Sequence, residues 1–245
     1  MESKQKIYEG KAKIIFSTPN SSEVIQYFKD EVTAFNKKKA DNIHGKGKIN
    51  NYISAFLMSK LANKGIKTHF ISLLNEREQL VKQVTIVPIE IVVRNLSAGN
   101  FSKKFHIEEG TEFRSPIIEF YYKSDKLLDP MVSEGHILSF QWLTHQELEE
   151  IKTLSLSINN ILTELFLNVD IKLVDFKLEF GKLHNNQQPD NLLLADEVSP
   201  DTCRLWDIHT KKRLDKDCYR LNLGSVIEAY KEVAQRLNAI PNHIV

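Results

Sequence analysis

The architecture of this 245-residue chain follows from one segment, Leu173-Val174-Asp175-Phe176-Lys177-Leu178-Glu179-Phe180-Gly181. Side chains of a β-strand point to opposite faces with a period of two, and apolar and charged residues alternate here with that period. One face carries Val174, Phe176, Leu178 and Phe180, and the other carries Leu173, Asp175, Lys177 and Glu179. The segment therefore predicts a strand that packs its apolar face against a core.

The charged face of this strand has two interpretations. Asp175 and Glu179 flank the amine of Lys177 on a rigid element, and such an arrangement can hold a divalent cation together with an anionic substrate group. The same alternation is typical of a solvated sheet face, because antiparallel sheets often have water on one side. The segment alone does not choose between a catalytic surface and a wet one.

The composition is typical of a soluble globular protein and does not indicate nucleic-acid binding. Hydrophobic residues make up 42% of the chain and charged residues 27%, and the formal net charge of +1 gives no overall field for nucleic acid. We expect no membrane partner, because no apolar run approaches the roughly 18–20 residues that cross a bilayer. The N-terminus lacks the apolar segment of a signal peptide, and Cys203 and Cys218 lack metal-binding spacing. These features predict a cytoplasmic protein with free thiols.

Hydrophobic periodicity along the chain predicts an α+β fold. We expect strands at residues 6–16, 24–29, 69–74, 80–87, 89–94 and 192–197. We expect helices over residues 49–61, from a capping box at 144–147 to about 165, and over 222–238. Residues 96–142 read as irregular with short helices. A boundary near residue 85 divides an N-terminal sheet lobe with one helix, residues 1–85, from a larger α+β lobe, residues 86–245.

Two lysines near the N-terminus are candidates for phosphate binding. In Gly10-Lys11-Ala12-Lys13 the two amines lie two residues apart on one face of the expected strand, where they can hold adjacent phosphates as point charges. The segment is neither a Walker A sequence nor a kinase glycine-rich loop. Exposed lysines are usually solvated, and this second interpretation stays open.

The segment Val87-Pro88-Ile89-Glu90-Ile91-Val92-Val93-Arg94 is an apolar strand that ends in an arginine, and a turn of small residues follows it. Ser97 or Asn100 could cap a helix whose free N–H groups face an anion. Arg94 would then add a bidentate contact to a phosphate. The alternative is an arginine that is satisfied by a nearby carboxylate.

A third group of charged residues follows the expected strand at 192–197. If that strand pairs with the 173–181 segment, Asp196 joins Asp175 and Glu179, and three carboxylates that converge repel one another unless a cation binds. Mg²⁺ suits such a site, because it takes a few carboxylates plus waters and substrate phosphates. Asp201 lies in a turn, and Arg204 just beyond it is a second anion contact. As structure alone, this part would be a tight loop with a buried tryptophan.

Nearly the whole chain resembles the SAICAR synthetase family, the phosphoribosylaminoimidazole-succinocarboxamide synthases. The matching motifs are Tyr8-Glu9-Gly10-Lys11-Ala12-Lys13, residues 87–94 through Ala98-Gly99, Asp129-Pro130-Met131, residues 173–181, and residues 196–201 with Arg204-Leu205-Trp206-Asp207. One position departs from the family pattern: Asn100 stands where a serine normally contacts the substrate phosphate. An amide N–H can still donate to phosphate.

The resemblance implies a reaction and a fold. ATP, L-aspartate and the carboxylate of carboxyaminoimidazole ribonucleotide (CAIR) would give the succinocarboxamide SAICAR, ADP and phosphate in de novo purine synthesis. Transfer of the γ-phosphoryl group would convert the unreactive carboxylate to an acyl phosphate, which the aspartate amine attacks. The implied fold is a two-lobed α+β fold with a kinase-like N-terminal antiparallel sheet lobe, a larger mixed lobe and ATP in the cleft. The family further implies Mg²⁺, a cytosolic location and a homodimer or larger homo-oligomer.

The resemblance also implies roles for individual residues. The nucleotide would be bound by Lys11, Ala12, Lys13, Ile15, Lys82 and Lys123. Mg²⁺ would be bound by Glu179 and Asp196. The substrate would be bound by Arg94, Ser97, Asn100, Asp201 and Arg204, three of which (Arg94, Asn100 and Arg204) would contact the phosphate. The catalytic residues would be Lys177, between the substrate carboxylate and the γ-phosphate, and Asp175 and Asp129, which position the substrate.

Two other functions remain as alternatives. A small-molecule kinase of inositol-kinase type would stop at phosphoryl transfer and would need no amine. A non-catalytic nucleotide-binding regulator would be expected to have lost part of the charged face. The charged residues Lys11, Lys13, Lys177, Glu179 and Asp196 are all present, which favours an enzyme.

Overall fold

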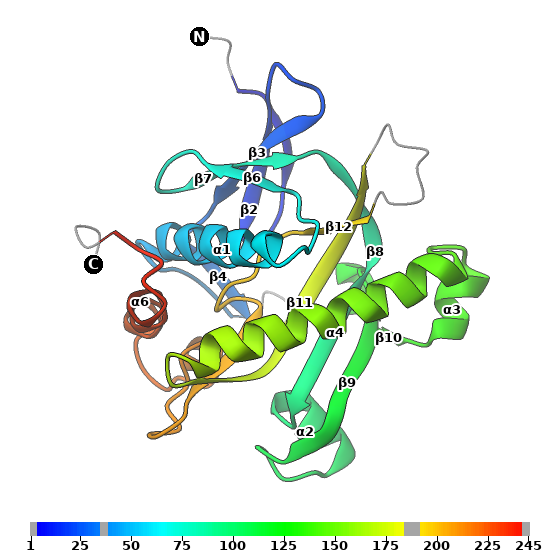
Figure 1. Cartoon of the computed structure of the whole chain (residues 1–245). Helices are drawn as coiled ribbons and strands as arrows, with labels where there is room; N and C mark the ends of the chain where they lie inside the picture. Colours follow the sequence, from blue (N-terminus) through cyan, green and yellow to red (C-terminus); the bar gives the residue numbers. More distant parts are fainter. Residues whose placement is uncertain (1–3, 35–38, 184–191, 242–245) are drawn as a thin grey trace.

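An antiparallel five-stranded sheet forms the N-terminal part of the computed structural model, which describes residues 4–34, 39–183 and 192–241 (Figure 1). Its strand order is β1-β2-β3-β7-β6. The bounds are β1 Lys6–Glu9, β2 Lys13–Ser17, β3 Glu23–Phe28, β7 Glu78–Lys82 and β6 Phe70–Leu73. The sheet thus places Lys13 at the start of β2.

The second sheet is built around the segment quoted first. Its order is β10-β9-β8-β11-β12, with β13 paired to the other half of β11. The bounds are β10 Met131–Val132, β9 Glu112–Tyr122, β8 Val84–Leu96, β11 Ile171–Leu183, β12 Leu192–Ala195 and β13 Cys203–Asp207. All its neighbouring strands are antiparallel. β11 lies at the centre and therefore contacts residues from three other strands.

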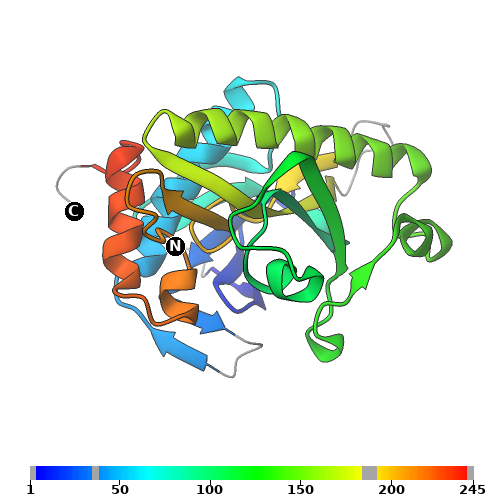
Figure 2. The same ribbon diagram turned by 90° about the horizontal axis from the view of Figure 1, so that it is seen from below.

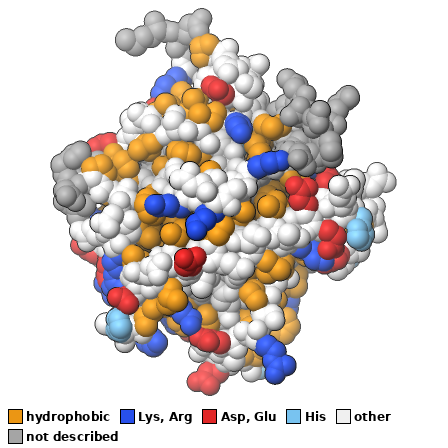
Figure 3. All heavy atoms as spheres, viewed as in Figure 1, with side chains coloured by type: hydrophobic (Ala, Val, Ile, Leu, Met, Phe, Trp, Pro, Cys, Tyr) orange, Lys and Arg blue, Asp and Glu red, His pale blue; other side chains and the backbone are white. Residues whose placement is uncertain are grey.

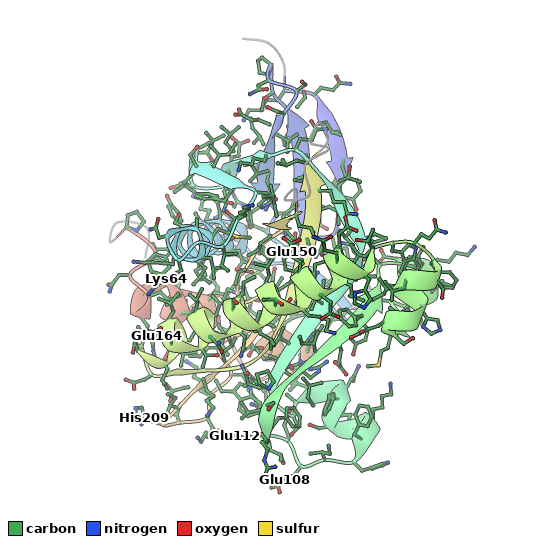
Figure 4. All side chains as sticks on the ribbon, turned by 45° about the vertical axis from the view of Figure 1, so that its right-hand side comes forward. Lys64, Glu108, Glu112, Glu150, Glu164 and His209 are labelled. Carbon is green, nitrogen blue, oxygen red and sulfur yellow. The ribbon has the colours of Figure 1, made fainter. Side chains whose placement is uncertain are left out.

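Three long helices cover the sheets. They are α1 Lys46–Asn63, α4 His145–Leu167 and α6 Val226–Arg236. α4 begins with the expected capping box, in which Thr144 accepts from the Glu147 backbone and Glu147 accepts from the Thr144 backbone. It crosses the second sheet, as the view from below shows (Figure 2). Glu150 and Glu164 mark its course in Figure 4, which also shows Glu108 and Glu112 at the end remote from the N-terminal sheet.

The remaining elements are short. They are the β4–β5 hairpin (Glu31–Ala34 and Lys39–Asn42), α2 Gly99–Phe105, the 3₁₀ turn η1 Asp125–Leu127, α3 Glu134–Ser139 and α5 Asp217–Arg220. Acidic and basic side chains are interspersed on the face in Figure 3, in agreement with the net charge of +1. Within the described ranges, no helix is both long and apolar enough to cross a membrane.

One hydrophobic core joins the helices to the second sheet. It contains Leu57 of α1, Ile151 of α4, Phe176 of β11 and Tyr230 of α6, all at most 1% exposed. α1 contacts the N-terminal sheet and α4, and α4 contacts β11 and β8, so burial of this core holds the two sheets relative to each other.

A β-bulge changes the facing that strict alternation predicts at the start of β11. The register with β13 shifts between Leu173 and Asp175, so Val174 is the additional residue. Leu173 joins the main core, whereas Val174 packs in a separate small cluster with Trp206. The prediction that Val174 shares the face of Phe176 and Leu173 that of Asp175 is therefore wrong, while the faces from Asp175 onward are as predicted.

Several predicted boundaries are also wrong. Residues 6–16 form the β1–β2 hairpin rather than one strand, because the chain reverses after Gly10, whose N–H donates to the Lys13 carbonyl. The break expected at Pro88 lies at Gln83, and Pro88 is inside the long β8. β9 falls in the part expected to be irregular, and β13 in the part expected to be a loop. Pairing with β8 and β11 selects these two strands, which their own periodicity does not predict.

Candidate active site

The charged side chains of β11 lie on a buried surface and not on a wet one. Asp175 is 4% exposed and Glu179 7%. Asp175 is paired in register with Arg94 of β8, and Glu179 with Glu90 of the same strand. The interpretation of this face as solvated is therefore wrong, because cross-strand ion pairs replace its water.

Lys177 is the centre of this surface. Its ammonium lies 2.9 Å from a Glu90 carboxylate oxygen, 2.7 Å from Glu179 and 3.9 Å from Asp196. Directly opposed like charges destabilise a sheet, and here the lysine lies between the two glutamates. Burial by itself would lower the pKa of Lys177, but the three carboxylates raise it well above its usual value. The amine is therefore held in its charged form.

Asp196 follows β12 in a left-handed conformation, with φ of 58°. Its carbonyl oxygen accepts a hydrogen bond from Gln26 Nε2 at 3.3 Å and from His69 Nε2 at 3.1 Å. His69 is buried, and burial is the main reason that its pKa falls to about 4. A neutral imidazole with its proton on Nε2 therefore helps to hold Asp196 with its carboxylate beside Lys177.

Lys13 brings a second amine to Asp196 from the N-terminal sheet. It forms an ion pair with Asp196, and its ammonium lies 2.9 Å from a Glu197 oxygen. Burial would lower the pKa of Lys13, but these two carboxylates raise it. The contact joins the two sheets through a pair of residues 183 positions apart.

Lys123 supplies the third amine, through an ion pair with Glu179. Burial would raise the pKa of the Glu179 carboxyl, but Lys177 and Lys123 lower it below its usual range. The lysine cluster, as we call it, consists of Lys13, Lys123, Lys177, Glu90, Glu179 and Asp196.

The lysine cluster can be tested as a Mg²⁺ site. No group of three or more His, Cys, Asp or Glu side chains suited to a metal occurs in the described part of the chain. Glu179 and Asp196 nevertheless lie around the same ammonium group, that of Lys177. Mg²⁺ is usually bound by one or two carboxylates together with water and substrate phosphates. The two residues therefore fit an ion that is bound together with a nucleotide.

A second cluster lies next to the first along β11 and is built on arginines. Arg94 places Nε 2.6 Å from Glu119 and Nη1 2.6 Å from Asp175. Arg204 places Nη1 2.8 Å from Asp175 and Nε 2.8 Å from Asp217. We call these five residues the arginine cluster. Both the phosphate-binding arginines predicted from sequence are thus brought together, on the two sides of one carboxylate.

The arginine cluster faces the start of α2. A Cβ added to Gly99, whose φ is +57°, would lie 2.6 Å from an Arg204 guanidinium nitrogen. Only glycine permits this close approach and this backbone conformation together. Asn100 follows in the first turn of α2 and is exposed. The structure therefore places Asn100 near Arg204 without using its side chain in a hydrogen bond between described residues.

The expected helix cap at Ser97 or Asn100 is wrong. Ala98 occupies the N-cap position and provides no side-chain cap. Ser97 is fully buried, donates its hydroxyl hydrogen to the Glu108 carbonyl and accepts from the Thr111 N–H at 3.1 Å. Its side chain closes the loop between β8 and β9, and a contact with substrate stays a prediction.

Asp201 takes part in a buried network away from the two clusters. Its carboxylate forms an ion pair with Lys46 and accepts hydrogen bonds from Asn50 at 2.9 Å and Tyr230 at 2.7 Å. Burial would raise its pKa, but Lys46 and nearby Lys216 lower it. The carboxylate ties the loop after β12 to α1 and α6. Its contact with substrate stays a prediction.

The other predicted residues lie around the lysine cluster or farther along its strands. Lys11 forms an ion pair with Asp125, and Asp129 accepts from the Ser124 N–H at 2.9 Å. Lys82 is exposed at the end of β7. Ala12 and Ile15 are half-buried at the turn and on β2. Their roles toward a nucleotide or substrate stay predictions.

Sequence reasoning missed the residues whose hydrogen bonds and ion pairs position the side chains of the site. Glu90 lies between two isoleucines in β8, and Glu119 lies between Ile118 and Phe120 in β9, and an acidic residue with apolar neighbours on both sides was the available signal. Asp217, Gln26 and His69 gave no such signal, because their partners are far away in sequence.

Comparison with known proteins gives one consistent result. The family model described as SAICAR synthetase matches residues 6–237. The phosphoribosylaminoimidazole-succinocarboxamide synthase of Ehrlichia chaffeensis is 77% identical over 99% of this chain and 100% of its own length, and that of Wolbachia pipientis from Culex pipiens is 63% identical over 95% and 96%. The crystal structure of an E. chaffeensis synthase has a TM-score of 0.95, covering 97% of this chain and 100% of its own. A SAICAR synthetase in complex with ADP is 41% identical, with a TM-score of 0.89 and coverage of 95% and 97%.

Proposed function

The chain belongs to the SAICAR synthetase family, and on that premise we propose how its residues make SAICAR from ATP, L-aspartate and CAIR. The observation that carries the proposal is the position of Lys177, whose ammonium contacts Glu90 and Glu179 and faces Asp196 on the central strand. Many anionic groups must meet in this reaction, and three lysines and two arginines converge on this face of the sheet.

The nucleotide would bind between the lobe of residues 1–85 and the lobe of residues 86–245. Lys11 and Lys13 would take the ATP phosphates, since their present partners are carboxylates that a phosphate can replace. Ala12 and Ile15 would lie near the adenine, with Lys82 and Lys123 as further contacts to the nucleotide. The ADP complex of a 41% identical SAICAR synthetase supports nucleotide binding by this fold.

Mg²⁺ would be held by Glu179 and Asp196 together with the nucleotide phosphates. The bound ion would neutralise part of the charge on the phosphates. Lys123 and Lys13 pair with these two carboxylates in the described structure, and the nucleotide phosphates would take over both amines as the ion binds. The ammonium group of Lys177 would remain between Glu179 and Asp196.

The ribonucleotide phosphate would bind at the arginine cluster. Arg94 and Arg204 are fixed by Asp175, Glu119 and Asp217, so their remaining N–H groups are oriented before substrate arrives. Asn100 would add its amide, while Asp175 and Asp129 position the rest of the substrate. Substrate contacts by Ser97 and Asp201 remain part of the proposal.

Lys177 would then lie between the CAIR carboxylate and the γ-phosphate. A charged amine at that place offsets the repulsion between the two anions and stabilises the charge of the transferred group. The carboxylate oxygen bonds to the γ-phosphorus as the bond to ADP breaks. The amine of L-aspartate next attacks the carbonyl carbon, phosphate leaves, and the amine proton is lost.

The test follows ADP and amide formation together. ADP release should require both CAIR and L-aspartate, and each ADP should accompany one SAICAR. Steady ADP release with CAIR alone and no amide product would refute the synthetase proposal and favour the kinase alternative, which the family membership does not favour. Nucleotide binding without any turnover would support the regulator.

We also propose a cytoplasmic location and a homodimer or larger homo-oligomer. The family pattern supports both, and the buried free thiols of Cys203 and Cys218 suit a reducing compartment. Light scattering of the purified protein would measure the oligomeric state. A monomer at assay concentration would refute that part.

A further inference from the structure

Glu109 lies in the loop that joins α2 to β9, and its carboxylate contacts two separate parts of the molecule. Oε1 accepts a hydrogen bond from the Gly99 N–H at 3.1 Å, and Oε2 lies 3.1 Å from a guanidinium nitrogen of Arg213. Gly99 is also the residue whose backbone packs directly against the Arg204 guanidinium. The carboxylate of Glu109 is therefore held beside the arginine cluster, although it is not one of its members.

The loop that carries Glu109 is fixed by bonds that do not involve this side chain. The Gly110 N–H donates to the Ser97 carbonyl at 2.8 Å, and the Ser97 N–H donates to the Thr111 carbonyl at 2.9 Å. The Ser97 hydroxyl accepts a further bond from the Thr111 N–H at 3.1 Å. Glu109 itself is exposed, so its carboxylate can leave its present hydrogen bond while the loop stays in place.

Arg213 offers this carboxylate a second position. Its guanidinium lies 3.5 Å from the centroid of the Trp206 ring, and the two residues also form an antiparallel β-bridge. Trp206 is buried, so the guanidinium is held against a fixed surface. A carboxylate that leaves the Gly99 N–H would keep this cation as its partner, and its charge would stay compensated.

The proposed function brings an anion to the same place. The ribonucleotide phosphate is assigned to Arg94 and Arg204, with the amide of Asn100 as a further donor. Asn100 directly follows Gly99 in α2. A carboxylate on the Gly99 N–H would repel that phosphate at short range. Glu109 must therefore withdraw before a phosphate binds at the arginine cluster.

We propose that Glu109 is an internal competitor of the substrate phosphate, which occupies the Gly99 N–H in the free enzyme and moves onto Arg213 when the ribonucleotide binds. The inference rests on the proposed function and adds to it a control on which anions bind at the arginine cluster. Because every phosphate ligand must displace the same carboxylate, the apparent affinities of all of them are lowered by one common factor. Inorganic phosphate, a product of the reaction, is thereby kept from blocking the site, whereas the ribonucleotide has further contacts.

The experiment compares Glu109→Gln with the wild-type protein by titration calorimetry, with the nucleotide site filled by ADP. Glutamine keeps an oxygen that can accept from the Gly99 N–H, but it removes the charge. The Kd for CAIR should fall about threefold or more, and the Kd for inorganic phosphate, measured in competition with CAIR, should fall by the same factor. Weaker binding of CAIR would show that the carboxylate positions the site instead. That result, or unchanged binding, would overturn the inference.

Glu108→Gln is the matched control. It removes the same charge from the neighbouring residue, which is exposed at the outer end of the loop (Figure 4). Both Kd values should stay at those of the wild type, and a similar gain in both variants would overturn the inference by assigning the effect to overall charge. Glu109→Gln should also melt at the wild-type temperature, because an exposed ion pair contributes little to stability.

Arg213→Met tests the second position of the carboxylate. In the displaced state Glu109 depends on Arg213 alone, so the Kd for CAIR should rise about threefold in this variant. The rise should vanish when Glu109→Gln is also present, because no carboxylate then needs a partner. A rise that persists in the double variant would mean that Arg213 acts on the ligand itself, and would overturn the proposed movement.

Arg204→Lys separates a failure of this inference from a failure of the proposed function. Lysine lacks the fork of N–H groups, so CAIR should bind about tenfold more weakly. If CAIR binding does not change, the ribonucleotide phosphate binds elsewhere and the proposed function is wrong at this site. If Arg204→Lys weakens binding and Glu109→Gln changes nothing, only the inference about Glu109 is overturned.

Discussion

The lysine cluster and the arginine cluster share one strand but use charge differently. In the lysine cluster Glu90 and Glu179 are paired in register, and the ammonium of Lys177 bridges them. In the arginine cluster each guanidinium contacts two carboxylates with different nitrogens, and Asp175 is shared between Arg94 and Arg204. The lysine cluster depends on the ammonium of a flexible side chain, which acts as a point charge. The arginine cluster depends on planar guanidinium groups that their carboxylate partners hold in fixed orientations.

The difference indicates which ligands can exchange at each place. A lysine amine on a flexible stem can leave a carboxylate for a phosphate, whereas the arginine fork loses orientation when one partner is removed. Carboxylates facing one another can accept a cation when the nucleotide arrives. The lysine cluster is thus suited to reaction, and the arginine cluster to rigid recognition.

The largest expected effect is on turnover in Lys177→Met. Loss of the bridging charge should lower kcat on the order of 10³-fold, because it acts on the transferred phosphoryl group. ATP should still bind in an equilibrium titration. Lys172→Met, on the same strand but paired at the surface with Glu112, should retain wild-type kcat. Near-normal kcat in Lys177→Met would remove Lys177 from the mechanism.

Arg94→Met tests the rigid cluster through stability. It leaves Glu119 and Asp175 buried without this cation, and breaking such a pair costs about 3–5 kcal/mol. Urea unfolding would measure the loss of unfolding free energy. Arg114→Met, on an exposed part of β9, should change it by less than about 0.5 kcal/mol. A small loss at Arg94 would contradict the view that this cluster is structurally fixed.

The next prediction concerns the pH dependence of stability that arises from His69, which donates a hydrogen bond to Asp196 of the lysine cluster. The His69 pKa falls from the usual 6.5 to about 4 in the folded protein, mainly because of burial. The unfolded chain therefore takes up a proton first, and stability present above pH 6.5 is lost as the pH falls toward 4, by at most about 3 kcal/mol. His69→Asn should reduce this loss between pH 7 and pH 4.5, as measured by urea unfolding.

His145→Asn is the matched control, since His145 is exposed on the first turn of α4. Its unfolding free energy should follow the wild-type pH dependence. If His69→Asn also follows the wild-type curve, His69 is not held neutral under Asp196.

The smallest effect is expected for Glu179→Gln. Removing one carboxylate charge should raise the Mg²⁺ concentration for half-maximal activity by about tenfold, the usual scale for a metal-site substitution. Glu112→Gln, at the remote end of β9, should leave the Mg²⁺ titration unchanged (Figure 4). An unchanged titration for Glu179→Gln would exclude it as a ligand.

Sequence patterns were sufficient where the physical signal is local. The period of two in residues 175–181 predicted the faces of β11, and the Thr144 box predicted the start of α4. The α+β class and the family likewise followed from periodicity and motifs, and both are confirmed. These signals depend on residues that are close together in the sequence, so they can be recognised without the tertiary structure.

Features that depend on distant partners could not be found this way. The bulge at Val174 is set by pairing with β13, and β9 exists because β8 offers it a partner. Likewise, the sequence supplied Lys13 and Asp196 as candidates, but only packing of the two sheets makes them an ion pair. The alternation of β11 determined which residues share a face. Whether that face is wet or buried depended on charges brought from other strands, because desolvation and Coulomb attraction act through space and not along the chain.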